Sequence, residues 1–260
     1  MSSVTGRIGE IKQPRGGYIK PSQFEVYNRN DGLMLSENEN VHASVIGMAV
    51  DYLTRFAMGT NVIEAFDISC KGAVIAEQMF QQKGTLKKVE KLLSGIKGLD
   101  DQSIINACKV VTYDVWLRNP MGAIMAKGAD ETNPDADTIN NIKIMVERSI
   151  SFWKEYGPII KDGFTFEPSG YTKIVDSGDG DYLTADTLWD FKVTKSKPTN
   201  KHTLQLLMYW IMGQHSGQDI YKNIQKLGIF NPRLNIVYLL DIKSVSEEII
   251  TEVEKDIICY

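Results

Sequence analysis

The chain has 260 residues, 43% of them hydrophobic and 24% charged, a composition typical of a globular protein with a substantial core. Its longest apolar runs are shorter than the ~18 residues that a membrane span needs, and its start lacks the pattern of a secretory signal, so no membrane partner is expected. A formal net charge of −4 excludes a chain that is basic overall, but it leaves room for a local cationic groove.

The cysteines indicate an intracellular chain. Cys70, Cys108 and Cys259 are odd in number and far apart, so they form neither a disulfide framework nor a zinc or iron–sulfur pattern. Thiols of this kind are typical of a reducing compartment. The expected location is therefore the cytoplasm.

The first half of the chain has a helical pattern after a polar start. Residues 1–38 are rich in Gly, Ser and Asn with little helical periodicity, which predicts an extended arm with at most a short strand. Apolar residues at steps of three and four then predict helices over residues 40–59, 71–83, 85–96, 101–118 and 137–156. Pro and Gly at 119–122 and 131–137 separate the later ones.

The second half changes to short strands. Strands are predicted at 171–178, 181–184, 187–194, 227–230 and 234–242, with helices near 200–214 and 218–226 between them. Ser244 followed by Glu247 reads as the capping box of a terminal helix. We expect a helical first half that leads into an α/β second half, all within one domain.

Two carboxylates are predicted to face each other in a hairpin within GDGDYLTADTLWDFK, residues 178–192. A turn centred between Ala185 and Asp186 places Asp181 opposite Asp190, with Lys192 on the same face of the sheet. Opposed like charges destabilise a strand pair, so either Lys192 or a divalent cation should compensate them. The alternative is an exposed rim with two hydrated aspartates.

The surroundings of the hairpin favour a site. Asp190 lies within TLWDFKV, a run of strand-forming residues, where an unpaired carboxylate would be costly. The next helix is apolar almost all round, except for Gln205 and Tyr209. These two are four residues apart, so they share one face of that helix.

Three motifs together resemble a known family. GDGD (Gly178–Asp181), WDFK (Trp189–Lys192) and QLLMY (Gln205–Tyr209) are similar to the Gly-x-x-Asp, Asp-x-Lys and Gln-x-x-x-Tyr motifs of the PD-(D/E)XK nuclease superfamily. Their order and spacing resemble its RecB-like and phage-exonuclease branch, which includes the lambda exonuclease and YqaJ-like types. Each motif alone is common, but all three lie within 32 residues. The resemblance covers about residues 165–257 well and the helical half only loosely.

The resemblance implies an α/β fold with a restriction-endonuclease-like core. Such a core is a central mixed β-sheet flanked by helices, here joined to a largely helical N-terminal half. Residues 1–260 would form one nuclease domain, with an arm at 1–38, a helical part at 39–160 and a catalytic core at 165–260.

The resemblance also implies a metal site. Asp181 and Asp190 would bind Mg²⁺ or Mn²⁺ through their carboxylates, and the backbone carbonyl of Phe191 would add an oxygen ligand. Relatives often take a further ligand from an upstream helix. Glu77 is the candidate for that ligand and His42 is its rival.

Other residues would act on the water and the substrate. Lys192 would orient or help deprotonate the attacking water and stabilise developing charge, while Gln205 and Tyr209 would position the metal ligands or the nucleic-acid backbone. We expect nucleic acid to contact the loop after the metal strand and the helix that follows it, at Lys195, Lys197, Lys201 and His202. A second lysine cluster, in KKVEKLLSGIK, is read as solvated charge.

These observations predict a Mg²⁺-dependent nuclease, in particular a DNA exonuclease. The alternatives are a nucleic-acid-binding or assembly protein that keeps the fold without cutting, and a scaffold whose acid pair is only a hydrated rim. The four cysteines that hold an iron–sulfur cluster in some RecB-like relatives are missing, so no such cluster is expected. Toroidal relatives make a homo-oligomer or a partner recombination protein compatible with the sequence, but nothing in the sequence identifies an interface.

Overall fold

The computed structural model describes residues 2–260, which divide into two compact units. The sheet unit combines the segment that ends at Asn30 with Phe152–Tyr260, and the helical unit spans Asp31–Ser151. The chain therefore leaves the sheet unit once and re-enters it within helix α9 (Ala136–Tyr156). In the part of the chain described, no helix is both long and apolar enough to cross a membrane.

The helical unit has helices at all five predicted positions, together with two short helices, at Val62–Ala65 and Pro120–Ala123, that were not predicted. The second begins at the proline that was expected only to separate helices, because the first turn of a helix tolerates proline. The helices of this unit are α2 (Ala43–Ala57), α3 (Val62–Ala65), α4 (Asp67–Gln78), α5 (Thr85–Ser94), α6 (Asp101–Val110), α7 (Asp114–Arg118), α8 (Pro120–Ala123) and the first part of α9. The single helix expected over residues 101–118 is interrupted by a 3-10 turn at Val111–Tyr113. Helix α4 packs on that turn so closely that a Cβ at Gly72 would lie 1.9 Å from the Tyr113 carbonyl oxygen.

Two polar contacts fix elements of the helical unit. Asp114 is buried and accepts hydrogen bonds of 2.5 Å from the hydroxyls of Tyr52 and Ser69, which joins α7 to α2 and α4. Arg148 on α9 donates two hydrogen bonds to Asp31, at 2.7 and 2.9 Å. The second contact attaches the start of the unit to its last helix.

The sheet unit is built on one mixed sheet of six strands in the order β2-β8-β7-β6-β5-β3. The strands are β2 (Glu25–Asn28), β3 (Lys161–Phe164), β5 (Gly180–Leu183), β6 (Thr187–Phe191), β7 (Lys226–Asn231) and β8 (Ile236–Asp241). Only β6 and β7 run parallel, and the other neighbours are antiparallel. A separate parallel pair joins β1 (Ser2–Ser3) to β4 (Val175–Ser177). The expected α/β class with a mixed sheet flanked by helices is confirmed.

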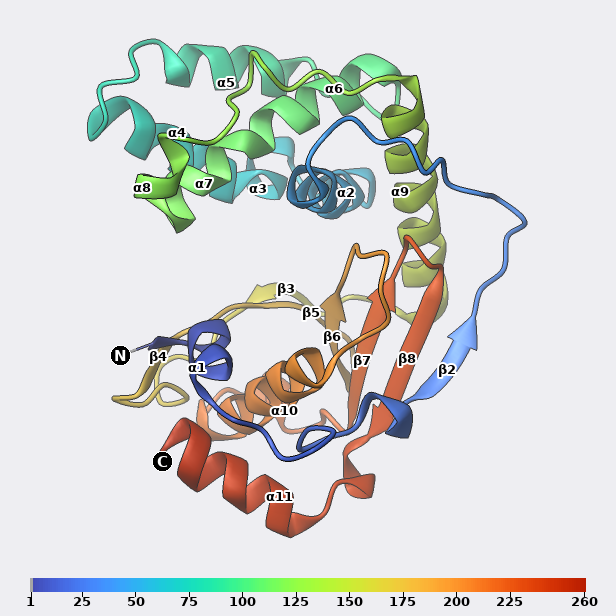
Figure 1. Ribbon diagram of the computed structural model, residues 1–260, viewed down its shortest axis with the longest axis vertical. Helices are drawn as coiled ribbons and strands as arrows, with labels where there is room; N and C mark the ends of the chain where they lie inside the picture. Colours follow the sequence, from blue (N-terminus) through green and yellow to red (C-terminus); the bar gives the residue numbers. More distant parts are fainter. Residues whose placement is uncertain (1) are drawn as a thin grey trace. The chain divides into compact units, whose positions relative to one another are not determined.

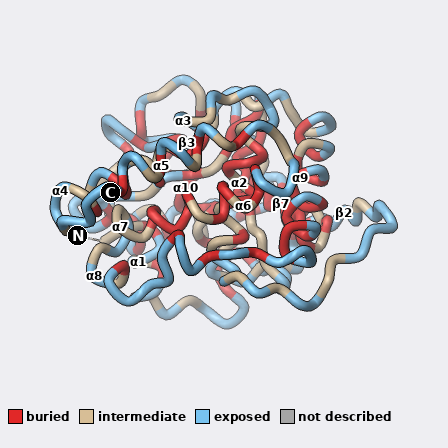
Figure 2. Tube along the Cα trace, turned by 90° about the horizontal axis from the view of Figure 1, so that it is seen from above, coloured by how far each residue is buried: buried red, intermediate tan, exposed pale blue. Residues whose placement is uncertain are grey.

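The two faces of the sheet bury different side chains, because strand residues alternate between faces. On one face Leu188 packs in a core with α10 (Asn200–His215), α1 (Val4–Glu10) and the end of the chain. On the other, Phe152 at the end of α9 stacks on Phe230, with ring centroids 4.0 Å apart, and meets the edge of Trp189 at 4.9 Å. Asp190 therefore faces α10. Within the sheet unit, most residues of α10 and β7 are buried, whereas β2 is exposed along its length (Figure 2).

The N-terminal segment is more structured than the extended arm that was expected. Helix α1 was not predicted because Gly6 and Gly9 lower its helix propensity. Its N-cap Ser3 accepts a hydrogen bond from the Gly6 amide, and Val4 and Ile8 are buried in the core. The segment continues through a 3-10 turn at Pro21–Gln23 into β2, an edge strand of the sheet.

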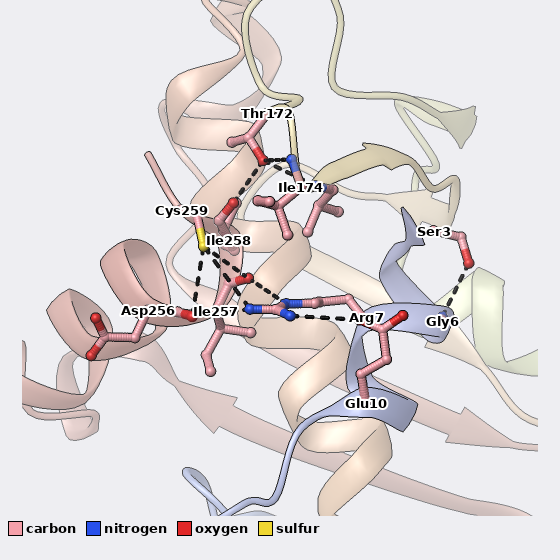
Figure 3. Close-up of polar contacts among 11 residues, drawn as sticks. Ser3, Gly6, Arg7, Glu10, Thr172, Ile174, Asp256, Ile257, Ile258 and Cys259 are labelled. Carbon is pink, nitrogen blue, oxygen red and sulfur yellow. Dashed lines mark hydrogen bonds and ion pairs between the residues drawn. The ribbon is translucent and has the colours of Figure 1, made fainter. Parts of the chain in front are cut away.

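The two ends of the described chain meet in the sheet unit (Figure 3). The Arg7 guanidinium donates hydrogen bonds to the carbonyls of Ile257 (2.9 Å) and Asp256 (3.2 Å). Thr172 donates to the carbonyl of Ile258 at 2.6 Å. These donors satisfy carbonyls that the last helical turns leave unpaired.

The C-terminal elements differ from the predictions in detail. The terminal helix α11 (Glu247–Glu252) is capped by Ser246 rather than Ser244, and it continues as a π-helix over Val253–Ile258. Ser244 instead closes a 3-10 turn by donating to the Asp241 carbonyl at 2.6 Å. The short helix expected over 218–226 is a 3-10 turn at Asp219–Tyr221.

Candidate active site

The hairpin has the register that the sequence predicted. Tyr182 pairs with Trp189 and Leu183 with Leu188, so paired residue numbers sum to 371. The Thr184 amide donates to the Thr187 carbonyl at 3.0 Å and closes the turn. The same register places Asp181 and Asp190 as the next pair along the hairpin.

Asp181 is held by the backbone of the opposite strand. The Phe191 amide donates a 2.7 Å hydrogen bond to Oδ2 of Asp181. In an extended strand the N–H and C=O groups of one residue point to the same side. The Phe191 carbonyl therefore also faces β5. The Asp181 carboxylate and the Phe191 carbonyl, two of the predicted oxygen ligands, thus lie along the same edge of β6.

Asp190 is a buried carboxylate in which one of the two oxygens has a partner. Its residue is 2% exposed, and Oδ1 lies 2.8 Å from the Lys192 ammonium. Oδ2 is buried, and no hydrogen-bond donor within residues 2–260 reaches it. Leaving such an oxygen unpaired costs free energy, which points to a cationic or protic ligand at this atom.

Lys192 is charged at neutral pH in this setting. Burial alone would lower its pKa, but the negative charges of Asp190 and Asp181 and the hydrogen bond to Asp190 together raise it. The side chain is 27% exposed, so the ammonium lies at the border between the core and solvent. It is placed to stabilise negative charge on a bound group.

Helix α10 contributes the predicted polar pair. Gln205 Nε2 donates a 2.8 Å hydrogen bond to the Tyr209 hydroxyl. Burial, and then the charges of Asp190 and Asp181, raise the pKa of Tyr209, although the bond from Gln205 lowers it, so the phenol stays protonated. A Cβ at Gly178 would lie 3.6 Å from the Tyr209 ring and 2.8 Å from Val4 Cγ2, which explains the glycine in the first motif.

The residues expected to contact nucleic acid lie on the loop after β6 and on the first turn of α10. Lys195, Lys197 and Lys201 are exposed. His202 instead accepts a 3.2 Å hydrogen bond from the Thr199 amide through Nδ1 and so helps to cap α10. Burial and the positive charge of Lys192 lower the pKa of His202, so it is uncharged at neutral pH.

The two candidates for an upstream ligand both belong to the helical unit. Oε2 of Glu77 accepts a 2.7 Å hydrogen bond from the Leu86 amide in the first turn of α5. His42 caps α2 by accepting from the Ser44 amide at 3.3 Å. Each therefore has a structural partner in its own unit, and the metal-binding role of Glu77 stays a prediction.

The donor atoms at the hairpin suit a magnesium ion that keeps several waters. Within residues 2–260, no three His, Cys, Asp or Glu side chains are grouped closely enough to form a metal site by themselves. Mg²⁺ is commonly bound through one or two carboxylates and completes its shell with water and substrate oxygens. Such a partial set of ligands could come from Asp181, Asp190 and the Phe191 carbonyl. Within it, Oδ2 of Asp190 is a buried ligand atom that accepts no hydrogen bond from the described residues.

The sequence did not predict one neighbour of the site. Thr203 on α10 donates a 2.6 Å hydrogen bond to the carbonyl of Ile19, so the N-terminal segment lies against this helix. The available signal was the pair Gly16–Gly17, which indicates a tight turn but not what the turn packs against.

Comparison of the chain with family models, with curated proteins and with solved structures gives no significant match.

Proposed function

We propose that this chain is a metal-dependent nuclease that hydrolyses phosphodiester bonds, in particular a DNA exonuclease. The observation that carries the proposal is Asp190, a buried carboxylate whose Oδ2 has no protein donor and whose Oδ1 meets Lys192 at 2.8 Å. A fold maintains such an atom at a cost unless a ligand completes it.

The three sequence motifs support the same proposal, because their residues share one face of the sheet unit. Asp181 and Asp190 are adjacent on antiparallel strands, and Tyr209 lies close enough for both charges to raise its pKa. The proposal includes a restriction-endonuclease-like core, which the mixed sheet and the helix after β6 are compatible with.

The proposed chemistry assigns a part to each side chain. Asp181, Asp190 and the Phe191 carbonyl would hold Mg²⁺ or Mn²⁺, which when bound supplies a Lewis acid and a water of lowered pKa. Lys192, as a fixed ammonium, would stabilise the negative charge that grows on the phosphate. Gln205 and Tyr209, joined by their 2.8 Å hydrogen bond on one face of α10, would position the metal ligands or the nucleic-acid backbone.

The test compares purified wild type with Asp190→Ala and Lys192→Ala on linear and closed-circular DNA, with Mg²⁺ and with EDTA. Asp186→Ala is the matched control, because Asp186 lies in the same hairpin but pairs with Lys226 at 2.8 Å. Mg²⁺-dependent loss of linear DNA alone, abolished by both site variants and kept by the control, would support an exonuclease. Cutting of the circle as well would indicate an endonuclease with the same site.

A second candidate is a nucleic-acid-binding or assembly protein that does not cut. The observation that favours it is the small number of ligands: among residues 2–260, no three His, Cys, Asp or Glu side chains are grouped closely enough to hold a metal ion. Binding of DNA by wild type without degradation of either form, under Mg²⁺ and Mn²⁺ alike, would favour this candidate over the nuclease.

A further inference from the structure

The N-terminal segment, residues 11–24, is anchored beside the start of α10. Thr203 is fully buried and donates to the Ile19 carbonyl at 2.6 Å. Tyr18, Ile19 and Phe24 are buried in the same core as Leu204 and Leu207 of α10. Figure 1 shows this segment passing from α1 by way of α10 to β2. Its backbone path is therefore fixed by α10.

Gly17 allows the segment to lie close against the start of α10. Its φ is +92°, and a Cβ there would lie only 2.6 Å from the Cβ of Asn200, the first residue of the helix. Gly16 has the same φ, but a Cβ there would meet only the flexible Lys20 side chain at 3.4 Å. The contact with α10 thus depends on a glycine at position 17 and not on one at position 16.

Two acid-free, cationic stretches come together at this contact. Residues 11–24 contain three cationic residues and no Asp or Glu, and residues 191–218 contain four lysines and no Asp or Glu. Apart from Lys192, all of these cationic residues are exposed: Lys12, Arg15, Lys20, Lys195, Lys197 and Lys201. The two stretches thus bring six exposed cationic side chains to this part of the sheet unit, where the carboxylate of Glu252 also accepts a 3.1 Å hydrogen bond from the Tyr18 hydroxyl.

We propose that these six side chains form one cationic surface that binds the phosphate backbone of nucleic acid and leads it to the carboxylates of the hairpin. The proposal rests on the proposed function and adds the N-terminal segment to it. Lys195 and Lys197 lie three and five residues after Lys192 in the loop that leaves β6, so a phosphate backbone bound at this surface would run on to the candidate active site. Binding would come from neutralised phosphates and released counterions.

The chemistry of the surface favours nucleic acid over a lipid membrane. Segments that bind membranes at the interface insert exposed apolar side chains. Within residues 11–24 and 191–218, the large hydrophobic side chains are buried or half-buried rather than exposed. The two stretches therefore offer charge without an apolar anchor.

The first experiment measures the affinity of the full chain for a fluorescent DNA duplex in EDTA, where no cleavage occurs, over a range of salt concentrations. The test variant is Lys12→Gln/Arg15→Gln/Lys20→Gln. The matched control is Lys222→Gln/Lys243→Gln/Lys255→Gln, which removes the same charge from exposed positions of the same unit. We expect the test variant to bind about 10-fold more weakly and to reduce the salt slope by about 3, with the control within about 2-fold of wild type.

The second experiment tests the anchoring. Gly17→Ala should release the backbone of the segment from α10, so that trypsin cuts after Lys12 and Arg15 and DNA binding weakens. Gly16→Ala shares the strain of a side chain at positive φ but keeps the contact with α10, so it should change neither property as much. Equal DNA affinity of the triple variant and its control would overturn the proposal. So would wild-type affinity in a Gly17→Ala protein that trypsin cuts readily.

The outcomes separate this inference from the nuclease proposal. Loss of DNA affinity in the triple variant of a chain that never cleaves DNA would support the surface and contradict the nuclease. If instead the chain cleaves DNA and the triple variant binds DNA normally, the nuclease proposal would be supported and the cationic surface contradicted. If the triple variant keeps its DNA affinity but loses binding to phosphatidylserine vesicles, the surface serves a membrane and the inference is wrong.

Discussion

The amide of Phe191 donates a 2.7 Å hydrogen bond to Oδ2 of Asp181, so a carboxylate side chain takes the role of a strand carbonyl at the open end of the hairpin. This bond fixes one oxygen of Asp181. It also links the position of that carboxylate to β6, the strand that contains Asp190 and ends just before Lys192.

Replacing Asp181 should separate its structural part from its proposed chemical part. Asp181→Asn keeps an oxygen that can accept from Phe191 but loses the charge, so stability should stay within about 1 kcal/mol of wild type while cleavage falls at least ~100-fold. Asp181→Ala should lose both the charge and the hydrogen bond from Phe191, which should lower the free energy of unfolding by about 1–2 kcal/mol more. Urea unfolding and Mg²⁺-dependent DNA cleavage measure the two effects, and an active Asn variant would contradict the metal role.

Mg²⁺ should stabilise the wild-type fold without any substrate. At a concentration of Mg²⁺ ten times its Kd, binding to the native state adds about 1.4 kcal/mol to the free energy of unfolding. Asp190→Asn should abolish this increment, whereas Asp186→Asn should keep it, because Asp186 is engaged with Lys226 away from the site. Thermal unfolding with and without Mg²⁺ reads this directly, and an equal increment in all three proteins would place the ion elsewhere.

Gly72→Ala should destabilise the helical unit despite the higher helix propensity of alanine. The added Cβ would lie 1.9 Å from the Tyr113 carbonyl, so α4 and the 3-10 turn must separate, at a cost of about 1–3 kcal/mol. Gly98→Ala is the matched control, because nothing lies within 4 Å of its Cβ position. The midpoint of urea unfolding should fall for the first variant and stay near wild type for the second.

The ion pair of Asp31 and Arg148 should make part of the stability pH-dependent. The hydrogen bonds from Arg148 lower the pKa of Asp31 below its ordinary value of 3.8, against the opposing effect of burial. A lowered pKa in the folded state means that this stabilisation is present above pH 3.8 and is lost as the pH falls through the folded-state value. Because Asp31 is exposed to solvent, Asp31→Asn should cost only about 1 kcal/mol at pH 7, and progressively less below pH 3.8.

Measurement of both proteins by urea unfolding at pH 7 and at several values below pH 4 checks this dependence. A difference that does not shrink in acid would mean that the pair contributes nothing through its charge.

Local signals in the sequence were enough to predict the register of the hairpin and the shared helix face of Gln205 and Tyr209. The turn between Ala185 and Asp186 and the alternation of residues fix which side chains oppose each other, and the spacing of Gln205 and Tyr209 fixes their shared helix face. Elements that depend on distant partners were not predictable. Strand β3 has the sequence KDGF, with Gly163 at φ 58°, and it forms only because β5 offers an edge.

The same limit explains the other differences. Helix α1 has two glycines and depends on burial of Val4 and Ile8 by α10, which local propensity cannot show. At the last helix, both Ser244 and Ser246 had the chemistry of a cap. Ser246 caps the helix because the hydroxyl of Ser244 already donates a hydrogen bond within the preceding 3-10 turn.

The division of the chain also sets an order of events during synthesis. Strand β2 pairs with β8 through partners such as Glu25 and Leu239, which are 214 residues apart. A ribosome therefore delivers the whole of Asp31–Ser151 before any later strand of the sheet emerges, so the helical unit has time to fold first. The nascent N-terminal segment therefore lacks its contacts with α10 and β8 until those elements have been synthesised. The candidate active site is thus among the last parts of the protein to be assembled.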